Sequence, residues 1–432
     1  MEFYEHLKSY LTEQEIEQLK ASLANESKHA ILLNLRKMND AKFLSLFPDV
    51  IKHPLVPHAY LFDKNKYELG KSIYHDLGCY YIQEPSAMIP SYLLSPNKGE
   101  TILDLCAAPG GKSVQASFLM ENEGAIISND LSRNRCNAIL ENVERLGIVN
   151  ITITNNDFSK IYQRYINYFD RIILDAPCSG SGMFRKEDKM MMDWSYNKVL
   201  KFQEIQKELI LHSYQMLKPG GTMVYSTCSF SYEEDEEIIK YLLESTDATL
   251  LPIENNPLFY INKKEPLGIH LFPFLFPGEG HYICLIKKPG ILTITNEKEK
   301  KGKDKPLNNY YLLLNNAHMH TAKYGDFIFS YPKEIRSDGL NIVRKGVKVG
   351  QLIGQNMRYD YHFSHYVNDF TPYFDIDFTE LQKYFRGETL PINIDKGLVM
   401  LRYDGINITI TNSDSKMIKN AIPKGLRKAI NK

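Results

Sequence analysis

The 432-residue sequence lacks several features that would assign its class directly. It contains no apolar run long enough to span a bilayer, and its first twenty residues lack the charged-then-apolar pattern of a signal peptide. Its 52 lysines and arginines balance its 52 aspartates and glutamates, so any long-range attraction to nucleic acid must come from local patches. These absences argue against a membrane protein and predict a cytoplasmic one.

Cysteine is also scarce, and none of the cysteines forms a C-x-x-C pair or lies in a zinc-like cluster. We therefore expect neither a disulfide framework nor a bound metal. Cysteine is more often a small buried hydrophobe than a reagent, so most of the six should be structural and one or two chemical. The six are Cys79, Cys106, Cys136, Cys178, Cys228 and Cys284.

Composition and apolar patterning along the chain predict four segments. Residues 1–80 form a small α+β segment, with a helix starting in a capping-box pattern at Thr12. Residues 81–290 form the core, and residues 291–309 are a charged linker without periodicity. Residues 310–432 are strand-prone and tyrosine-rich, and predict a separate mixed or mostly β domain.

Within the core, short apolar runs alternate with helical patterns. This alternation predicts a doubly wound, Rossmann-like α/β sheet of parallel strands. Ligands of such sheets bind at the carboxyl ends of the strands. The expected strands cover 101–106, 125–130, 151–157, 171–178 and 222–229, and the expected helices 112–123, 132–147 and 197–221.

A glycine-rich loop, "DLCAAPGGKS" (104–113), lies between the first core strand and its helix. Gly110 and Gly111 permit close approach of a ligand, and the helix start offers free N–H groups. A phosphate-binding loop would need glycine where Cys106 stands, and the dinucleotide pattern G-x-G-x-x-G is absent. The ligand is therefore expected to be neither a triphosphate nor a dinucleotide.

Aspartates end three successive strands, at Asp130, Asp157 and Asp175. An acid after the second strand commonly holds ribose hydroxyls, and a ring of acids suits a cationic nucleoside such as S-adenosylmethionine. The competing interpretation is that each aspartate merely forms a turn. That interpretation is favoured for one aspartate, whereas three at successive strand ends favour the ligand.

Two thiols follow neighbouring strands, in "DAPCSGSGMFRK" (175–186) and "YSTCSF" (225–230), and should face one crevice. The chemistry that needs a thiol beside a methyl donor is methylation of cytosine C5. A thiolate that adds to C6 turns the ring into a nucleophilic enamine. Asp175 could hydrogen-bond N3, and a basic neighbour such as Lys186 could lower the thiol pKa. The residues alone do not decide whether Cys178 or Cys228 attacks.

These stretches, in this order and spacing, resemble the motifs of the RNA cytosine-C5 methyltransferase family. "YYIQEPSAM" (80–88) and "FPGEGHYICLIKK" (276–288) also fit, so the resemblance covers about 80–290. The "GMFRK" and "PGEGHY" details are most similar to the F-type branch of the bacterial ribosomal enzymes. That branch modifies 16S rRNA near the decoding centre and often carries a C-terminal PUA-like domain. The resemblance implies a methyltransferase sheet here, with RNA-binding segments at 1–80 and 310–432.

The resemblance also implies roles for individual residues. Cys228 would be the nucleophile, as in the RNA family, whereas Cys178 would be the nucleophile in an arrangement of the DNA type. In the RNA arrangement Cys178 assists product release, Asp175 contacts N3, and Lys186 is a candidate for supporting the thiol. S-adenosylmethionine would be held by Cys106, Ala107, Ala108, Pro109, Gly110, Gly111, Lys112, Asp130, Arg135, Asp157 and Asp175.

The expected partner is RNA, either 16S rRNA or the small ribosomal subunit, with the protein a monomer and no membrane involved. The same chemistry on tRNA or 23S rRNA is the first alternative. A non-catalytic RNA-binding or ribosome-assembly factor is the second, and the thiol pair and acids argue against it. A small-molecule methyltransferase would explain neither the second thiol nor the terminal domains.

Overall fold

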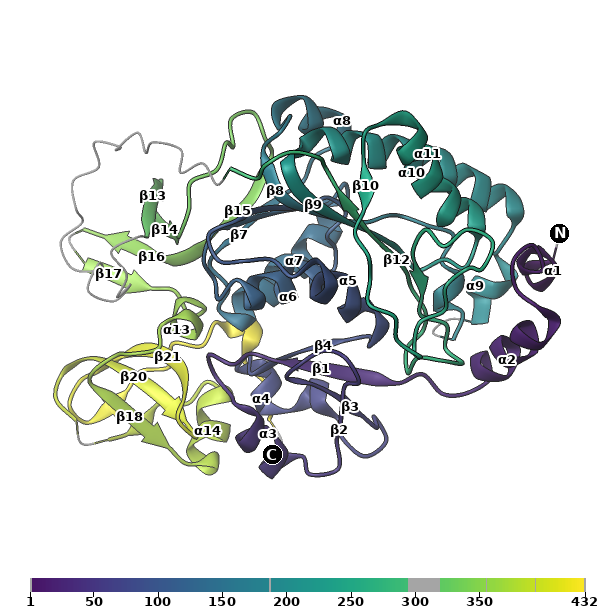
Figure 1. Cartoon of the computed structure of the whole chain (residues 1–432). Coiled ribbons are helices and arrows are strands. Elements are labelled where there is room, and N and C mark those ends of the chain that lie inside the picture. The colour runs from purple at the N-terminus through teal and green to yellow at the C-terminus, as the bar shows by residue number, and fades with distance from the viewer. Residues whose placement is uncertain (1, 186–187, 294–318, 355, 393, 431–432) are drawn as a thin grey trace.

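The computed structural model describes residues 2–185, 188–293, 319–354, 356–392 and 394–430 (Figure 1). Most of the predicted linker 291–309, together with Lys186, lies outside these residues. Within the described part of the chain, no helix has the length and apolar character needed to cross a membrane.

The central sheet has the strand order β10-β12-β9-β8-β5-β6-β7-β15. Its middle strands β5 to β9 pair in parallel, which confirms the predicted doubly wound parallel sheet. At one edge β12 runs antiparallel to β9 and pairs with β10 and β11, and at the other edge β15 runs antiparallel to β7. The bounds are β5 (Thr101–Asp104), β6 (Ala125–Asn129), β7 (Ile151–Thr154), β8 (Phe169–Asp175), β9 (Leu217–Thr227), β10 (Thr249–Leu250), β11 (Ile269–His270), β12 (Tyr282–Lys287) and β15 (Ile342–Lys345).

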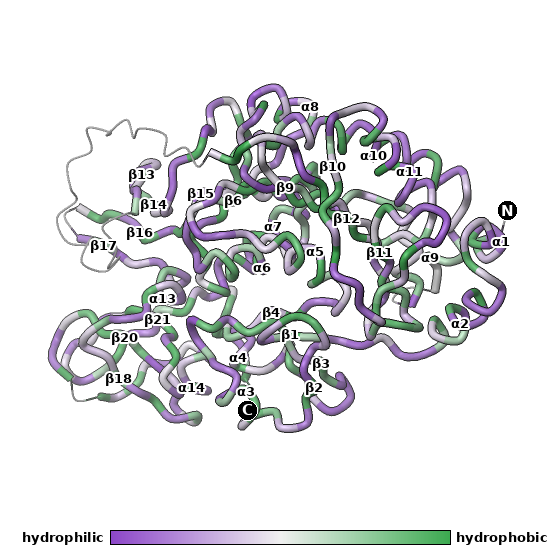
Figure 2. The backbone as a smooth tube through the Cα atoms, in the orientation of Figure 1, coloured by the Kyte–Doolittle hydropathy of each residue, from purple (hydrophilic) through white to green (hydrophobic). Residues whose placement is uncertain are grey.

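Helices cover both faces of this sheet because its strands are apolar on both sides. Ile102 and Ile126 pack into one core cluster, and their neighbours Leu103 and Ile127 pack into another on the opposite face. In Figure 2, hydrophobic and hydrophilic colours alternate along α10 and α11, as expected of helices with one buried face. The helices are α5 (Ile89–Leu94), α6 (Gly111–Leu119), α7 (Arg133–Leu146), α8 (Phe158–Ile161), α9 (Asp188–Met192), α10 (Tyr196–Met216) and α11 (Glu236–Ser245).

Local signals set the ends of several helices. Gly147 ends α7 in a left-handed conformation with φ of 70°, as the sequence predicts. The Thr12 capping box is present, with Glu15 as its partner. The structure differs at α10, which ends at Met216, before the Pro-Gly-Gly stretch. Strand β9 therefore begins at Leu217 rather than at residue 222, because the proline and glycines are accommodated within the strand.

The N-terminal part combines short helices with a small antiparallel sheet of order β2-β3-β1-β4. Helices α1 and α2 pack on the core, where the Phe3 ring lies 5.3 Å from that of Trp194. The elements are α1 (Phe3–Leu7), α2 (Glu13–Leu23), β1 (His29–Leu33), α3 (Asp40–Leu46), β2 (Ile51–Lys52), β3 (Ala59–Phe62), α4 (Ile73–Asp76) and β4 (Tyr80–Gln83).

The C-terminal part contains two further sheets, of order β13-β14-β16-β17 and β18-β20-β21-β22-β19. Figure 1 shows the second of these sheets beside the N-terminal sheet, and one hydrophobic cluster joins them. Strand β15 comes from the segment 310–432 yet completes the central sheet. The remaining elements are β13 (His320–Tyr324), β14 (Phe327–Tyr331), β16 (Val347–Ile353), β17 (Asn356–Tyr359), α13 (Phe363–Tyr366), β18 (Tyr373–Ile376), α14 (Phe378–Phe385), β19 (Leu390–Pro391), β20 (Gly397–Tyr403), β21 (Ile406–Ser413) and β22 (Met417–Ile418).

Candidate active site

The glycine-rich loop connects β5 to α6 and is tied to the neighbouring strand β6. The Ala107 N–H donates to the carbonyl of Asn129 at 2.8 Å, and the Ala108 N–H donates to Asp130 Oδ2 at 3.3 Å. Gly110 has φ of +103°, and a Cβ there would lie 3.2 Å from Ile139 Cγ2. A side chain at this position would therefore be strained and would press against α7.

Asp130 and Asp157 both follow the ends of parallel strands, as predicted, but each is also engaged locally. Asp130 accepts from the Ser132 N–H at 2.9 Å and lies 3.3 Å from Arg135 Nη1. Asp157 is the N-cap of α8, and hydrogen bonds from the Ser159 hydroxyl and N–H lower the pKa of its carboxyl. These contacts are the ones that the turn interpretation requires. Arg135 also donates to the Ala108 carbonyl at 2.7 Å, so it braces the loop.

Carboxylates surround the loop where a cationic nucleoside would bind. Burial, followed by Asp104, Asp130 and Asp175, raises the pKa of the Cys106 thiol. Asp104 is fully buried, which raises its pKa to about 7, and its Oδ1 has no hydrogen-bond partner among the described residues. A set of acids with an unpartnered buried oxygen and a glycine-lined turn fits S-adenosylmethionine, which carries a sulfonium, an ammonium group and ribose hydroxyls.

Asp175 lies at the end of β8 and is held from several sides. Lys112 Nζ lies 2.6 Å from its Oδ2, and the Ser226 hydroxyl donates to its Oδ1 at 2.6 Å. Burial opposes ionisation, but Lys112 and His281 more than offset it, so the pKa of Asp175 lies below its ordinary value. The Lys112 ammonium, predicted from sequence to serve the cofactor, therefore lies against the acid beside the thiols.

A buried row of polar groups, His281, Ser86 and Glu84, extends from Asp175. The sequence motifs did not single out these three as site residues. His281 Nε2 lies 3.8 Å from Asp175 Oδ1, and His281 Nδ1 lies 3.1 Å from Ser86 Oγ. Ser86 Oγ in turn donates to Glu84 at 2.5 Å. Burial, then Lys112, lowers the pKa of His281 to about 4. The signal for these residues was present, since Glu84 and His281 belong to the stretches 80–88 and 276–288.

The two thiols meet, with Cys178 Sγ and Cys228 Sγ 3.1 Å apart. The hydrogen bond with Cys228, burial and the nearby Glu234 raise the pKa of Cys178 well above its ordinary value. Arg185, the basic residue before Lys186, forms an ion pair with Glu279 at 2.9 Å. The remaining three cysteines, Cys79, Cys136 and Cys284, are buried.

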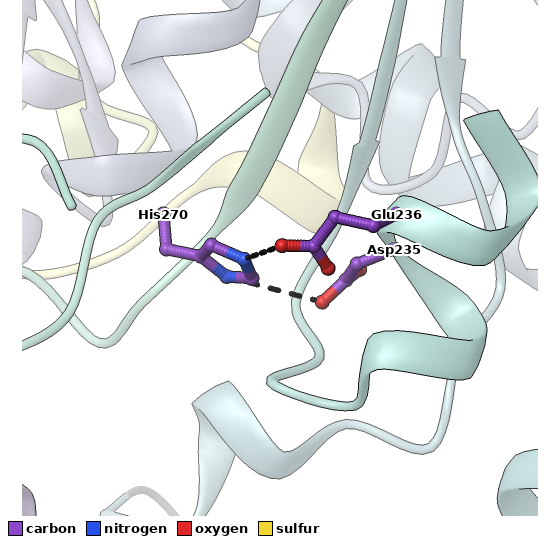
Figure 3. A group of neighbouring side chains, drawn as sticks. All are labelled: Asp235, Glu236 and His270. Atoms are coloured by element: carbon purple, nitrogen blue, oxygen red, sulfur yellow. Dashed lines mark hydrogen bonds and ion pairs between the residues drawn. The ribbon is translucent and has the colours of Figure 1, made fainter. Parts of the chain in front are cut away.

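Asp235, Glu236 and His270 form a buried cluster (Figure 3), and Asp235 is hydrogen-bonded to Thr227, the residue before Cys228. His270 Nε2 is 2.9 Å from Glu236 Oε1, and the Thr227 hydroxyl donates to Asp235 Oδ1 at 2.6 Å. Their ligand atoms lie within 4.8 Å of one another, a spacing that could hold a metal ion. Hydrogen bonds use one oxygen of each acid and one ring nitrogen, and the bond from Thr227 ties the cluster to the loop that carries Cys228. The other polar atoms, Asp235 Oδ2, Glu236 Oε2 and His270 Nδ1, have no hydrogen-bond partner among the described residues.

A groove of about 680 Å³ lies between the end of α2 and the segment that contains Phe184 and Arg185. The methionines of α9 differ in their surroundings. Met190 packs against the cluster around Phe184 and Trp194, whereas the Met192 side chain is 84% exposed and lines the groove. The groove is also lined by Asn25, Ser27, Lys64 and Arg185.

Comparison with protein families accounts for most of the chain. Residues 91–287 match the family described as 16S rRNA methyltransferase RsmB/F. Residues 1–85 match the N-terminal domain of 16S rRNA methyltransferase RsmF, and residues 371–428 match the methyltransferase RsmF PUA domain. The ribosomal RNA small subunit methyltransferase F of Vibrio vulnificus is 30% identical over 390 residues, which cover 84% of this chain and 82% of that protein.

The chain belongs to the RsmF family. The family consists of S-adenosylmethionine-dependent RNA methyltransferases with a Rossmann-like core, an N-terminal domain and a PUA domain. The PUA match lies within the predicted C-terminal domain 310–432, whose fold the sequence alone had left open.

Other methyltransferases match the core. A tRNA (cytosine(49)-C(5))-methyltransferase of Pyrococcus abyssi is 42% identical over 232 residues, which cover 51% of this chain and 74% of that protein. A crystal structure of a methyltransferase homolog from Pyrococcus horikoshii is 27% identical, with a TM-score of 0.59 and coverage of 66% and 93%. NSun6 from the same organism, solved with SFG, is 21% identical with a TM-score of 0.61 and coverage of 67% and 98%, and supports the fold.

Proposed function

We propose that this protein transfers a methyl group to C5 of a cytidine in 16S rRNA through a covalent adduct between Cys228 and C6. The observation that carries the proposal is the 3.1 Å approach of Cys228 to Cys178 beside Asp175, next to the glycine-rich loop. A cytosine held in this crevice would have its C6 at one thiol and its N3 at the Asp175 carboxylate.

The residues divide the work as follows. Cys228 as a thiolate adds to C6, the C5–C6 π electrons form a C4–C5 double bond, and the C4–N3 π electrons move to N3, which takes up a proton. In the free protein Lys112 carries this proton and Asp175 is ionised, because the pKa of Asp175 is lowered and that of Lys112 is raised. The pair would pass the proton to N3. Bound S-adenosylmethionine would supply the methyl group that C5 receives. A solvent base then takes the C5 proton, the C5–C6 double bond re-forms, Cys228 leaves as a thiolate, and N3 returns its proton to Lys112. Cys178 assists this release.

The residues proposed to hold the cofactor are Cys106 to Lys112, Asp130, Arg135 and Asp157. Their buried acids and glycine turn support this assignment, and no metal is needed for the chemistry. The RNA would reach the thiols along the groove lined by Lys64, Phe184 and Met192. A base must leave its stack for C6 to become accessible, so the target cytidine would be flipped out or single-stranded.

The choice of 16S rRNA rests on the extent of the match. Similarity to the small subunit methyltransferase F covers 84% of this chain, including the N-terminal and PUA regions. Similarity to the tRNA enzyme reaches higher identity but covers 51%. We therefore keep a tRNA cytidine as the second candidate substrate.

The test uses radiolabelled S-adenosylmethionine and RNA from cells that lack this protein. Wild type should label 16S rRNA, Cys228→Ala should be inactive, and Cys178→Ala should accumulate a covalent protein–RNA adduct on denaturing gels. Label in tRNA would favour the second substrate. Retained activity in Cys228→Ala, with an inactive Cys178→Ala that forms no adduct, would reverse the assigned roles. Absence of label in every RNA would refute the function.

A further inference from the structure

A buried carboxylate bridges the two loops that carry the thiols. Glu234 ends the short 3₁₀ helix η5 (Tyr232–Glu234) and is fully buried. Its Oε1 accepts from the Ser179 N–H at 2.7 Å, and its Oε2 accepts from the Ser179 and Ser229 hydroxyls, each at 2.5 Å. Ser179 directly follows Cys178, and Ser229 directly follows Cys228, so one side chain fixes both cysteines.

Gln206 on α10 extends this hydrogen-bond network to Pro177, the residue before Cys178. Its Nε2 donates to the Pro177 carbonyl at 2.8 Å and lies 3.3 Å from Glu234 Oε1. The residues on both sides of Cys178 are therefore tied to the same carboxylate. Burial raises the pKa of Glu234, but the hydrogen bonds from Ser179, Ser229 and Gln206 oppose that rise. All of these partners can donate, an arrangement that suits an ionised carboxylate with acceptor capacity at both oxygens.

The Glu234 carboxylate lies beside both thiol-bearing loops, through Ser179 on one and Ser229 on the other. The groups that act on the Cys178 thiol are Cys228, Glu234 and Asp175, and all of them raise its pKa, as does burial. A negative charge beside a thiol disfavours its thiolate. Loss of the Glu234 charge should therefore make Cys178 more reactive, which gives the positioning role a readout besides methyl transfer.

We propose that Glu234 is a positioning residue that holds the Cys178 and Cys228 loops in register, so that both thiols face one cytidine. This inference rests on the proposed function for its meaning in catalysis. Its geometric and electrostatic content can be tested without RNA.

The first experiment measures alkylation of each thiol by iodoacetamide against pH, read by mass spectrometry of the RNA-free protein. Glu234→Gln keeps the shape but loses the charge, and its amide N–H₂ cannot accept a hydrogen bond. Cys178 should then be alkylated at least threefold faster at pH 7.5, relative to Cys228. The matched control is Glu233→Gln, which removes the same charge one residue earlier, where Glu233 pairs with His6 at 3.0 Å. Equal alkylation profiles in the two variants would overturn the proposal.

The second experiment measures methyl transfer. Glu234→Gln should lower kcat at least tenfold with little change in the KM for S-adenosylmethionine, and Glu233→Gln should not. The Ser179→Ala and Ser229→Ala double variant retains the carboxylate and loses both hydroxyls, so it covers the case in which Glu234→Gln fails to fold. It should also lower kcat, without accelerating Cys178 alkylation. Wild-type kcat in this double variant would refute the positioning role. If wild type labels no RNA, the proposed function fails, and the alkylation result still decides whether Glu234 controls the thiols.

Discussion

At the scale of single residues, His281 is a buried titratable group in contact with the candidate active site. The groups that face it are Asp175, Lys112 and Glu84, and its ring also contacts the Ser86 hydroxyl. Burial and the Lys112 ammonium disfavour the imidazolium, although Asp175 and Glu84 favour it. The neutral ring is therefore the form in the folded protein near neutral pH.

This leads to a prediction about stability and pH. The pKa of His281 is about 4 in the folded state and about 6.5 in the unfolded chain, so the unfolded chain binds more protons between these values. The free energy of unfolding is therefore unaffected by this titration above about pH 6.5 and decreases as the pH falls toward 4. Wild type should lose about 1–2 kcal/mol more than His281→Gln between pH 7.5 and pH 5. Urea denaturation at both pH values measures this difference, and equal losses would contradict it.

At the scale of helices and strands, local patterns determine what could be predicted from the sequence. The alternation of apolar runs located the parallel strands, and Gly147 and Thr12 located helix ends. The acids at strand ends and the two thiols were placed at one edge because parallel strands all end there. The roles of Glu234 and His281 could not be predicted in this way. Their partners are distant in sequence (Ser179 for Glu234, Asp175 for His281), so only the packed structure brings them together.

The turn into α6 leads to a prediction at this scale. In Gly110→Ala, the positive φ would cost about 1–3 kcal/mol, and the new Cβ would crowd Ile139. The loop should shift, and the dissociation constant for S-adenosylmethionine should rise at least tenfold by calorimetry. Gly99→Ala is the matched control, because Gly99 has φ of +80° and a Cβ added there would meet no atom within 4 Å. If both variants lose similar stability but only Gly110→Ala loses affinity for S-adenosylmethionine, the affinity loss comes from crowding rather than from backbone strain. Unchanged affinity in both variants would argue against this loop as the cofactor site.

At the scale of the whole molecule, the two ends of the chain form one unit. The cluster that contains Ile31 and Tyr80 of the N-terminal sheet also contains Leu401 and Ile408 of the C-terminal sheet. Polar contacts reinforce it, since Asp404 accepts from both Lys42 and Tyr74, at 2.7 and 2.8 Å. This contact could not be predicted from the sequence, because each sheet has an apolar face of its own and nothing local indicates what covers it.

The shared core makes a prediction that neighbouring residues of one strand can test. Leu401 and Met400 are both fully buried on β20, but Leu401 packs in the core shared with the N-terminal sheet, and Met400 packs on the opposite face with Val149 and Val349. Either residue changed to alanine should cost about 2–5 kcal/mol. Leu401→Ala should also speed amide hydrogen exchange in β1 and β4, at the other end of the chain, because a cavity there loosens both sheets. Met400→Ala should instead speed exchange in β14 and β16. Identical exchange patterns in the two variants would mean that the terminal domains do not share one cooperative core.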